Sequence, residues 1–162
     1  MIRTMMMFGM VIALALLSYA LYTQHAEGLY PCVRCIYQRG ALLIIIASGI
    51  VGLLHHRLHI IGIMGAFLGS IYGLYQAYIH VGVIKGTIID VCGFRPDFGS
   101  LGALDRKLPW LFSAGGDCAD ASWQLWGLSM PEWMFVVFSV YGITTLVLIY
   151  LWINNLFKRH KP

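Results

Sequence analysis

The cysteines are the residues of this chain best suited to chemistry. Cys32 and Cys35 form a Cys-x-x-Cys pair, whereas Cys92 and Cys118 stand far apart along the chain. A Cys-x-x-Cys spacing closes a small, strained disulfide that exchanges readily with other thiols. The first pair therefore predicts a redox device. The second pair is compatible with a redox role or with a structural crosslink.

The neighbours of Cys35 favour its thiolate form. We expect Cys35 to lie at or near a helix N-terminus, where the helix dipole stabilises an anion. Arg39 follows four residues later and so shares a helical face with it, and Arg34 adds a further positive charge. A stabilised thiolate is also a better leaving group in disulfide exchange.

Other roles for these residues remain open at this point. A structural zinc site also uses Cys-x-x-Cys, but it usually takes a second close pair, which this chain lacks, so we expect no metal. A disulfide between Cys32 and Cys35 closes too small a loop to restrict an unfolded chain much. On the residues alone, Arg39 fits an interfacial anchor and His80 an interfacial polar group slightly better than site residues.

The composition indicates the kind of protein that must position these cysteines. Of the 162 residues, 59% are hydrophobic and only 11% are charged, which excludes an ordinary soluble domain. A net charge of +4 is too small to suggest a nucleic-acid surface. Apolar stretches of membrane-spanning length predict an all-α, four-helix integral membrane bundle forming a single domain over residues 1–162, with spans at about 5–22, 36–54, 60–79 and 133–153.

Two loops lie on the side of the membrane opposite the termini, at about 23–35 and 80–132. All four cysteines fall in or at the edge of these loops, which fits an oxidising compartment, in a bacterium the periplasm. Basic residues directly after the last span favour a cytoplasmic side for both termini. The first apolar stretch is too long for a signal-peptide core and lacks a clear cleavage site, so we expect it to span the membrane.

Two further patterns concern packing. Leu101, Leu104, Leu108 and Leu111 recur at helical spacing in the long loop and predict a short surface helix, with an irregular loop as the alternative. Small residues at four-residue spacing in the third span predict close helix packing, with Gln76 nearby as a helix-contact residue; they are Gly65, Gly69, Gly73 and Ala77.

Electrons that reach the cysteines must have an acceptor. The sequence contains no Gly-rich dinucleotide loop, no haem-attachment motif and no iron–sulfur motif. The remaining possibility is an acceptor dissolved in the bilayer. A quinone is the obvious class of two-electron carrier that could meet Cys35 and Arg39 at the membrane edge.

Three segments closely resemble the disulfide bond formation protein B family, DsbB. They are Tyr30 to Gly40 (YPCVRCIYQRG), His80 at the end of the third span, and Ser113 to Trp133 (SAGGDCADASWQLWGLSMPEW). The likeness covers almost the whole chain, including two outer loops with two cysteines each, and is far more specific than a lone Cys-x-x-Cys.

The resemblance implies an inner-membrane protein that reoxidises a DsbA-like periplasmic thioredoxin-fold oxidase and passes the electrons to ubiquinone or menaquinone. It implies that Cys92 accepts attack by the partner's thiolate, and that Cys118, released or paired with Cys32, relays oxidation. Cys35 matches the cysteine that meets the quinone, Arg39 the arginine that supports quinone and thiolate, and His80 a histidine at the quinone pocket.

These expectations combine into a quinone-dependent thiol oxidase of the bacterial inner membrane. Two electrons per disulfide would move from the partner to Cys92 and Cys118, then to Cys32 and Cys35, then to quinone. The alternatives are a non-catalytic membrane scaffold or small channel braced by disulfides, and an enzyme of the vitamin K epoxide reductase type. The Gly116, Asp117, Cys118 context and the lack of an appended thioredoxin-like domain argue against the latter.

Overall fold

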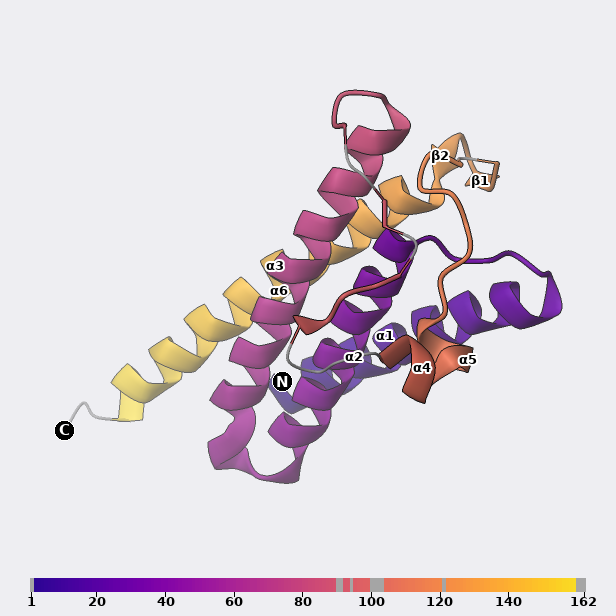
Figure 1. Ribbon diagram of the computed structural model, residues 1–162. Coiled ribbons are helices and arrows are strands. Elements are labelled where there is room, and N and C mark those ends of the chain that lie inside the picture. The colour runs from indigo at the N-terminus through magenta and orange to yellow at the C-terminus, as the bar shows by residue number, and fades with distance from the viewer. Residues whose placement is uncertain (1, 90–91, 94, 100–103, 121, 160–162) are drawn as a thin grey trace.

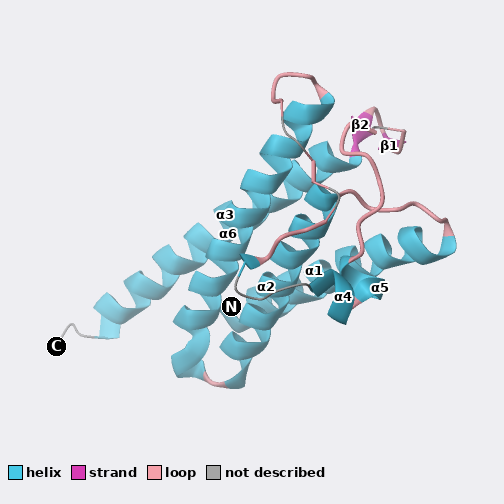
Figure 2. Ribbon diagram, viewed as in Figure 1, coloured by secondary structure: helices cyan, strands magenta, loops and turns pink. Residues whose placement is uncertain are grey.

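Four long helices make up most of the protein (Figures 1 and 2). The computed structural model describes residues 2–89, 92–93, 95–99, 104–120 and 122–159, the last five by their backbone alone. The long helices are α1 (Ile2–Ala26), α2 (Val33–Leu54), α3 (His59–Ile84) and α6 (Met130–Arg159). A 3-10 turn, η1 (His56–Leu58), joins α2 to α3, and the short elements α4 (Leu104–Lys107), α5 (Pro109–Phe112), β1 (Gln124–Leu125) and β2 (Leu128–Ser129) lie before α6.

The four long helices are long and apolar enough to cross a membrane, with candidate spans at Ile2–Ala26, Val33–Leu54, His56–Ile84 and Met130–Asn154. Each begins before the apolar stretch read from the sequence. At 1.5 Å per residue, the 26 residues of α3 exceed a hydrocarbon layer of about 30 Å, so its ends reach the headgroup region. The chain is an all-α membrane protein built on a four-helix bundle, as predicted.

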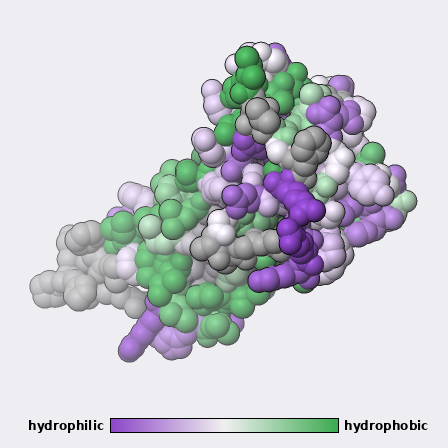
Figure 3. All heavy atoms as spheres, viewed as in Figure 1, coloured by the Kyte–Doolittle hydropathy of each residue, from purple (hydrophilic) through white to green (hydrophobic). Residues whose placement is uncertain are grey.

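The surface of the helices is apolar, as a lipid environment requires. Phe8, Leu54 and Leu68 are each more than 60% exposed. Figure 3 shows hydrophobic side chains over much of the helical body and hydrophilic side chains gathered over the loop side on the right. A soluble protein could not expose so much apolar surface, and the membrane supplies the missing cover.

The helices pack unequally. α3 lies between α2 and α6 and packs extensively against both, whereas α1 packs on α2 and barely touches α6. The small residues of α3 allow this closeness: a side chain at Gly69 would press on Ile44 and Ile45 of α2, and one at Gly73 would overlap Phe138 of α6. The stripe predicted from the sequence therefore packs within the bundle.

In place of the predicted surface helix the structure has two short helices, and α5 packs against α1 and α2. Pro109 begins α5, where its missing N–H costs nothing, and this divides the leucine pattern between α4 and α5. Leu111 and Phe112 are buried in the core together with residues of α1 and α2. Leu101 lies outside the described residues. The long loop is thus anchored in the bundle at α5 as well as at its two ends.

The start of α6 is fixed by polar contacts. The Glu132 carboxylate accepts hydrogen bonds from the backbone N–H and hydroxyl of Ser129, both at 2.9 Å, and forms a 3.0 Å ion pair with Lys85 at the end of α3. Trp126 takes a positive φ of 53° in the two-residue turn between β1 and β2 and is largely exposed. These contacts tie the loop-side ends of α3 and α6 together.

Candidate redox site

The Cys-x-x-Cys pair lies at the N-terminus of α2, with both cysteines free. Cys32 is the N-cap residue: its sulfur accepts a hydrogen bond from the backbone N–H of Cys35 at 3.3 Å. The two sulfurs are 3.1 Å apart. The N-cap residue of a helix lies close to the third residue of that helix. A Cys-x-x-Cys motif that starts at the N-cap therefore brings its two thiols within exchange distance.

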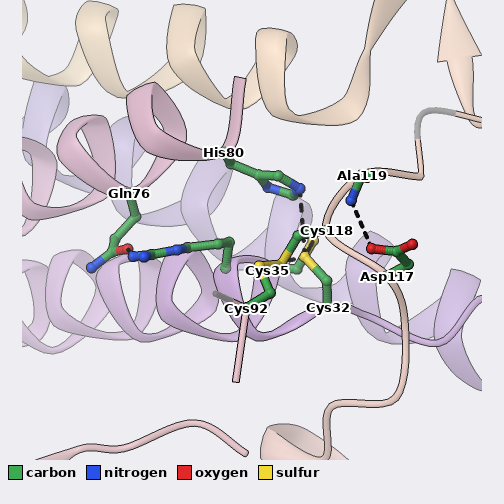
Figure 4. Close-up of a disulfide and its surroundings, with 9 residues drawn as sticks. Cys32, Cys35, Gln76, His80, Cys92, Asp117, Cys118 and Ala119 are labelled. Carbon is green, nitrogen blue, oxygen red and sulfur yellow. Dashed lines mark hydrogen bonds between the residues drawn. A yellow bond between two sulfur atoms is a disulfide. The ribbon is translucent and has the colours of Figure 1, made fainter. Parts of the chain in front are cut away.

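His80 approaches the pair from α3 (Figure 4). Its Nε2 atom lies 3.5 Å from the Cys32 sulfur, and the ring is almost completely buried. The sequence places His80 at the end of the third span but gives no sign that its ring meets Cys32, which is 48 residues away. The contact depends on the close packing of α2 against α3.

Several hydrogen bonds meet at the Cys32 sulfur. The pKa of the Cys32 thiol is lowered to about 5, chiefly by its hydrogen bond with the Cys35 thiol, with His80 adding to the effect and burial opposing it. The spacing of Cys35 and Arg39 predicted a stabilised thiolate at Cys35. The helix-start effect is present, but the sulfur that caps the helix is that of Cys32.

Arg39 is buried between helices, one turn beyond Cys35. Its guanidinium donates hydrogen bonds to the Gln24 side-chain oxygen, to the carbonyl of Ala20 at 2.9 Å and to the carbonyl of Leu111 at 3.2 Å. Arg39 therefore joins α2 to α1 and α5, and its positive charge also acts on the Cys35 sulfur. An interfacial anchor would be solvated, whereas this side chain is buried and donates to acceptors of the protein.

Cys92 and Cys118 form a disulfide. The segment that carries Cys118 is held against the first pair, because the N–H groups of Gly115 and Gly116 both donate to the carbonyl of Pro31, at 3.0 and 3.1 Å. A side chain at position 116 would overlap the Tyr30 carbonyl, so the contact requires glycine. Figure 4 shows the disulfide beside Cys32 and Cys35.

A cavity of about 580 Å³ opens beside the cysteines. Its walls come from α1, α2, the end of α3, the Gly115–Trp123 loop and the start of α6, and most of its lining is apolar or aromatic. The polar residues that the sequence singled out lie on one part of this wall: Cys32, Cys35, Arg39 and His80. The cavity is large enough for a small aromatic ring with substituents.

Sequence reasoning missed two glutamines at this site. Gln24 holds the Arg39 guanidinium, and Gln38 lines the cavity while its side-chain nitrogen, buried, has no hydrogen-bond partner among the described residues. A glutamine inside an apolar stretch is the signal that could have found Gln38, because unpaired polar groups at that depth are costly. Gln24 lies past the first predicted span and carries no such signal.

Arg34 points away from the sulfurs. Its guanidinium donates a 2.6 Å hydrogen bond to Gln76 on α3 and lies 5.9 Å from the centre of the Tyr37 ring. Gln76 is thus a helix-contact residue, as expected. Arg34, which stands between the two cysteines in the sequence, therefore joins α2 to α3.

The arrangement is suited to disulfide exchange followed by electron transfer into the cavity. A disulfide and a dithiol are held next to each other by backbone hydrogen bonds, and the dithiol also faces a cavity of its own. Three possible metal ligands also meet at this site. Among the described residues, the atoms of Cys32, Cys35 and His80 lie within 4.8 Å of one another and could hold a metal ion.

Comparison with known proteins agrees with this arrangement. A family model described as disulfide bond formation protein DsbB matches residues 2–148. Disulfide bond formation protein B of Psychromonas ingrahamii is 37% identical over 154 residues, which covers 92% of this chain and 81% of the relative. The protein of the same name from Aeromonas hydrophila is 35% identical over 150 residues, with 90% and 85% covered, and that of Haemophilus influenzae is 37% identical over 142 residues, with 85% and 80% covered.

These matches exceed what a shared membrane topology alone would give, because they extend over the cysteine-bearing loops as well as the helices. The chain belongs to the DsbB family of multi-pass bacterial membrane proteins that act in disulfide bond formation.

Proposed function

We propose that this protein is a quinone-dependent thiol oxidase of the bacterial inner membrane. It reoxidises a DsbA-like periplasmic oxidase of the thioredoxin fold and passes the electrons to ubiquinone or menaquinone in the bilayer. The observation that supports this most directly is that the Cys32–Cys35 pair lines a largely apolar cavity and is held by backbone hydrogen bonds beside the loop that carries the Cys92–Cys118 disulfide.

The first exchange takes place at the outer pair. A thiolate of the reduced partner attacks the Cys92 sulfur, the Cys92–Cys118 bond breaks, and Cys118 leaves as a thiolate. The partner's second thiol then attacks the mixed disulfide, so the partner leaves with its own disulfide and Cys92 as a thiol. Two electrons and two protons have moved from the partner to Cys92 and Cys118.

The second exchange joins the two pairs. The reduced outer pair attacks a Cys32–Cys35 disulfide, which restores the Cys92–Cys118 bond and leaves Cys32 and Cys35 reduced. The state described above, with the outer pair oxidised and the inner pair reduced, has the composition that follows this step. The hydrogen bonds from Gly115 and Gly116 to Pro31 keep the two pairs close enough for it.

The cavity fits a quinone as the electron-accepting substrate. Its apolar lining suits the ring, and Arg39, His80 and Gln38 offer hydrogen-bond donors for carbonyl oxygens. Trp133 and Val137 also line a second cavity of about 550 Å³ between α1 and α6, which is almost entirely apolar and suits a polyprenyl tail. A bound quinone takes up two electrons and two protons as Cys32 and Cys35 close their disulfide, and it leaves as the quinol.

Four residues of the site have separate roles in the proposed reaction. Both cysteines line the cavity; Cys35 would react with the acceptor, Cys32 would form the bond that completes the disulfide, and His80, 3.5 Å from the Cys32 sulfur, would hold the proton that this thiol gives up. Arg39 supplies positive charge next to Cys35 and joins α2 to α5 and to α1, which lines the cavity. In the proposed orientation both termini are cytoplasmic and both pairs face the periplasm.

The experiment that tests the proposal uses purified protein, a reduced dithiol partner and a soluble ubiquinone analogue. We expect the quinone absorbance to fall as the partner is oxidised, with one quinone consumed per partner disulfide formed. The matched control is a Cys32→Ser, Cys35→Ser variant, which keeps the outer disulfide and should consume no quinone. If the unsubstituted protein with four intact cysteines leaves the quinone unchanged, the scaffold hypothesis replaces this one.

A further inference from the structure

The reduced Cys32–Cys35 pair and His80 bring together the ligand atoms that thiophilic metal ions prefer. Two sulfurs and one imidazole nitrogen lie within 4.8 Å of one another. The Cys32 sulfur is 3.1 Å from the Cys35 sulfur and 3.5 Å from His80 Nε2. In tetrahedral zinc coordination, bond lengths of about 2.3 Å to sulfur and about 2.0 Å to nitrogen separate two sulfurs by about 3.8 Å and a sulfur from a nitrogen by about 3.5 Å. The two distances at the Cys32 sulfur thus differ from these values by less than about 1 Å.

We propose that these three residues form an inhibitory site for a thiophilic divalent cation such as Zn²⁺ or Cd²⁺, open only when the Cys32–Cys35 pair is reduced. On binding, two metal–sulfur bonds and one metal–nitrogen bond form, and the proton of any cysteine that is still a thiol leaves to solvent. Nothing is oxidised or reduced. The inhibition rests on the proposed function, because the ion occupies the thiols that would otherwise pass electrons to the acceptor.

Charge and burial favour such an ion. Two thiolates and a neutral imidazole balance the two positive charges of the metal, so the complex buries no net charge. Cys32 and His80 are almost completely buried, which limits competition by water. All three residues line the 580 Å³ cavity, which leaves room for water at a fourth coordination position. Three protein ligands with an open position are typical of exchangeable zinc.

The surroundings also limit the affinity. A metal-bound histidine usually donates its other ring nitrogen to a carboxylate or carbonyl, but His80 Nδ1 has no hydrogen-bond partner among the described residues. The positive charge of Arg39 acts on Cys35 and opposes a cation there. With Cys92 and Cys118 joined in a disulfide, neither supplies a fourth thiolate. The site is therefore suited to reversible inhibition.

The test measures metal binding directly, on full-length detergent-solubilised protein carrying Cys92→Ser and Cys118→Ser, so that only the inner pair is titrated. After reduction and removal of the reductant, Cd²⁺ is added and thiolate-to-metal charge-transfer absorbance is followed. We expect one Cd²⁺ per chain, no band after the pair is oxidised, and none in a further Cys35→Ser variant. Adding His80→Ala should weaken binding at least about tenfold. The control is His25→Ala, because His25 is an exposed loop-side histidine that contacts the Trp110 carbonyl.

Three results would overturn the inference: no stoichiometric band in the reduced protein, an equal band in the oxidised protein, or unchanged affinity in the His80→Ala variant. Circular dichroism shows whether the His80→Ala variant has folded. If it has not, Cd²⁺ binding to the protein that retains His80 still tests the inference through the first two results. The measurement needs neither quinone nor partner. If metal binds as expected but the oxidase assay fails, the proposed function falls and the metal site stands.

Discussion

Replacing Gly116 by alanine tests whether the two cysteine pairs work as one unit. The added methyl group would overlap the Tyr30 carbonyl, and relief of that overlap breaks the hydrogen bonds from Gly115 and Gly116 to Pro31. Two such bonds contribute about 1 to 3 kcal/mol in net terms. At about 1.4 kcal/mol per factor of ten, the docked position of the Cys118 segment becomes about 5- to 150-fold less populated. We expect exchange between the pairs to slow by a similar factor.

Stopped-flow mixing measures this effect. Partner-driven quinone reduction should slow in Gly116→Ala, whereas a pre-reduced protein mixed with the quinone analogue should complete its first turnover at the normal rate, because that step uses only the inner pair. Gly115→Ala is the matched control, since its methyl group would lie 3.6 Å from the Tyr30 side chain, an ordinary contact. Equal partner-driven rates in Gly116→Ala and the unsubstituted protein would refute the reasoning, as would equal slowing in both variants.

Three further substitutions have separate readouts. Arg39→Lys cannot reach all three acceptors of the guanidinium, so we expect slower quinone reduction and a free energy of unfolding lower by about 2 kcal/mol; a normal turnover number would contradict the role of Arg39. Gln38→Leu removes a buried, unpaired amide, so thermal stability should hold or rise while the KM for the quinone analogue increases about 2- to 12-fold; an unchanged KM would show that Gln38 does not contact the acceptor. Cys92→Ala should abolish oxidation of the partner, measured by thiol titration, but leave single-turnover oxidation of the Cys32–Cys35 pair by quinone; residual partner oxidation would point to another entry residue.

The sequence predicted the parts of the molecule that depend on local information. Hydropathy over about 20 residues locates the four spans because each span meets the lipid as an independent helix. The approach of the Cys32 and Cys35 sulfurs follows from their spacing at a helix start, and the placement of Arg39 one turn later follows from helical geometry. Each of these features is decided within a few residues of the chain.

The features that the sequence did not predict depend on contacts between distant segments. The partners of Arg39 lie on α1 and α5, 15 to 72 residues away. Where the leucine pattern predicted a surface helix, Leu111 and Phe112 enter the core, because the open end of the bundle offers apolar surface that a loop can bury. The thiol whose pKa is lowered is Cys32, chiefly through its hydrogen bond with the Cys35 thiol, and His80 adds to the effect from α3, 48 residues away, where local sequence patterns give no sign of the contact.

The sparse contact between α1 and α6 has a consequence for how the enzyme would be supplied. The second cavity is lined by both helices, with α2 and α3 behind it, and is almost entirely apolar, so an isoprenoid acceptor would reach it by lateral diffusion within the bilayer. The turnover rate would then depend on the mole fraction of the acceptor among the lipids and not on its concentration in the total volume. Adding empty micelles or extra phospholipid at fixed amounts of protein and long-chain acceptor would slow the reaction by surface dilution alone.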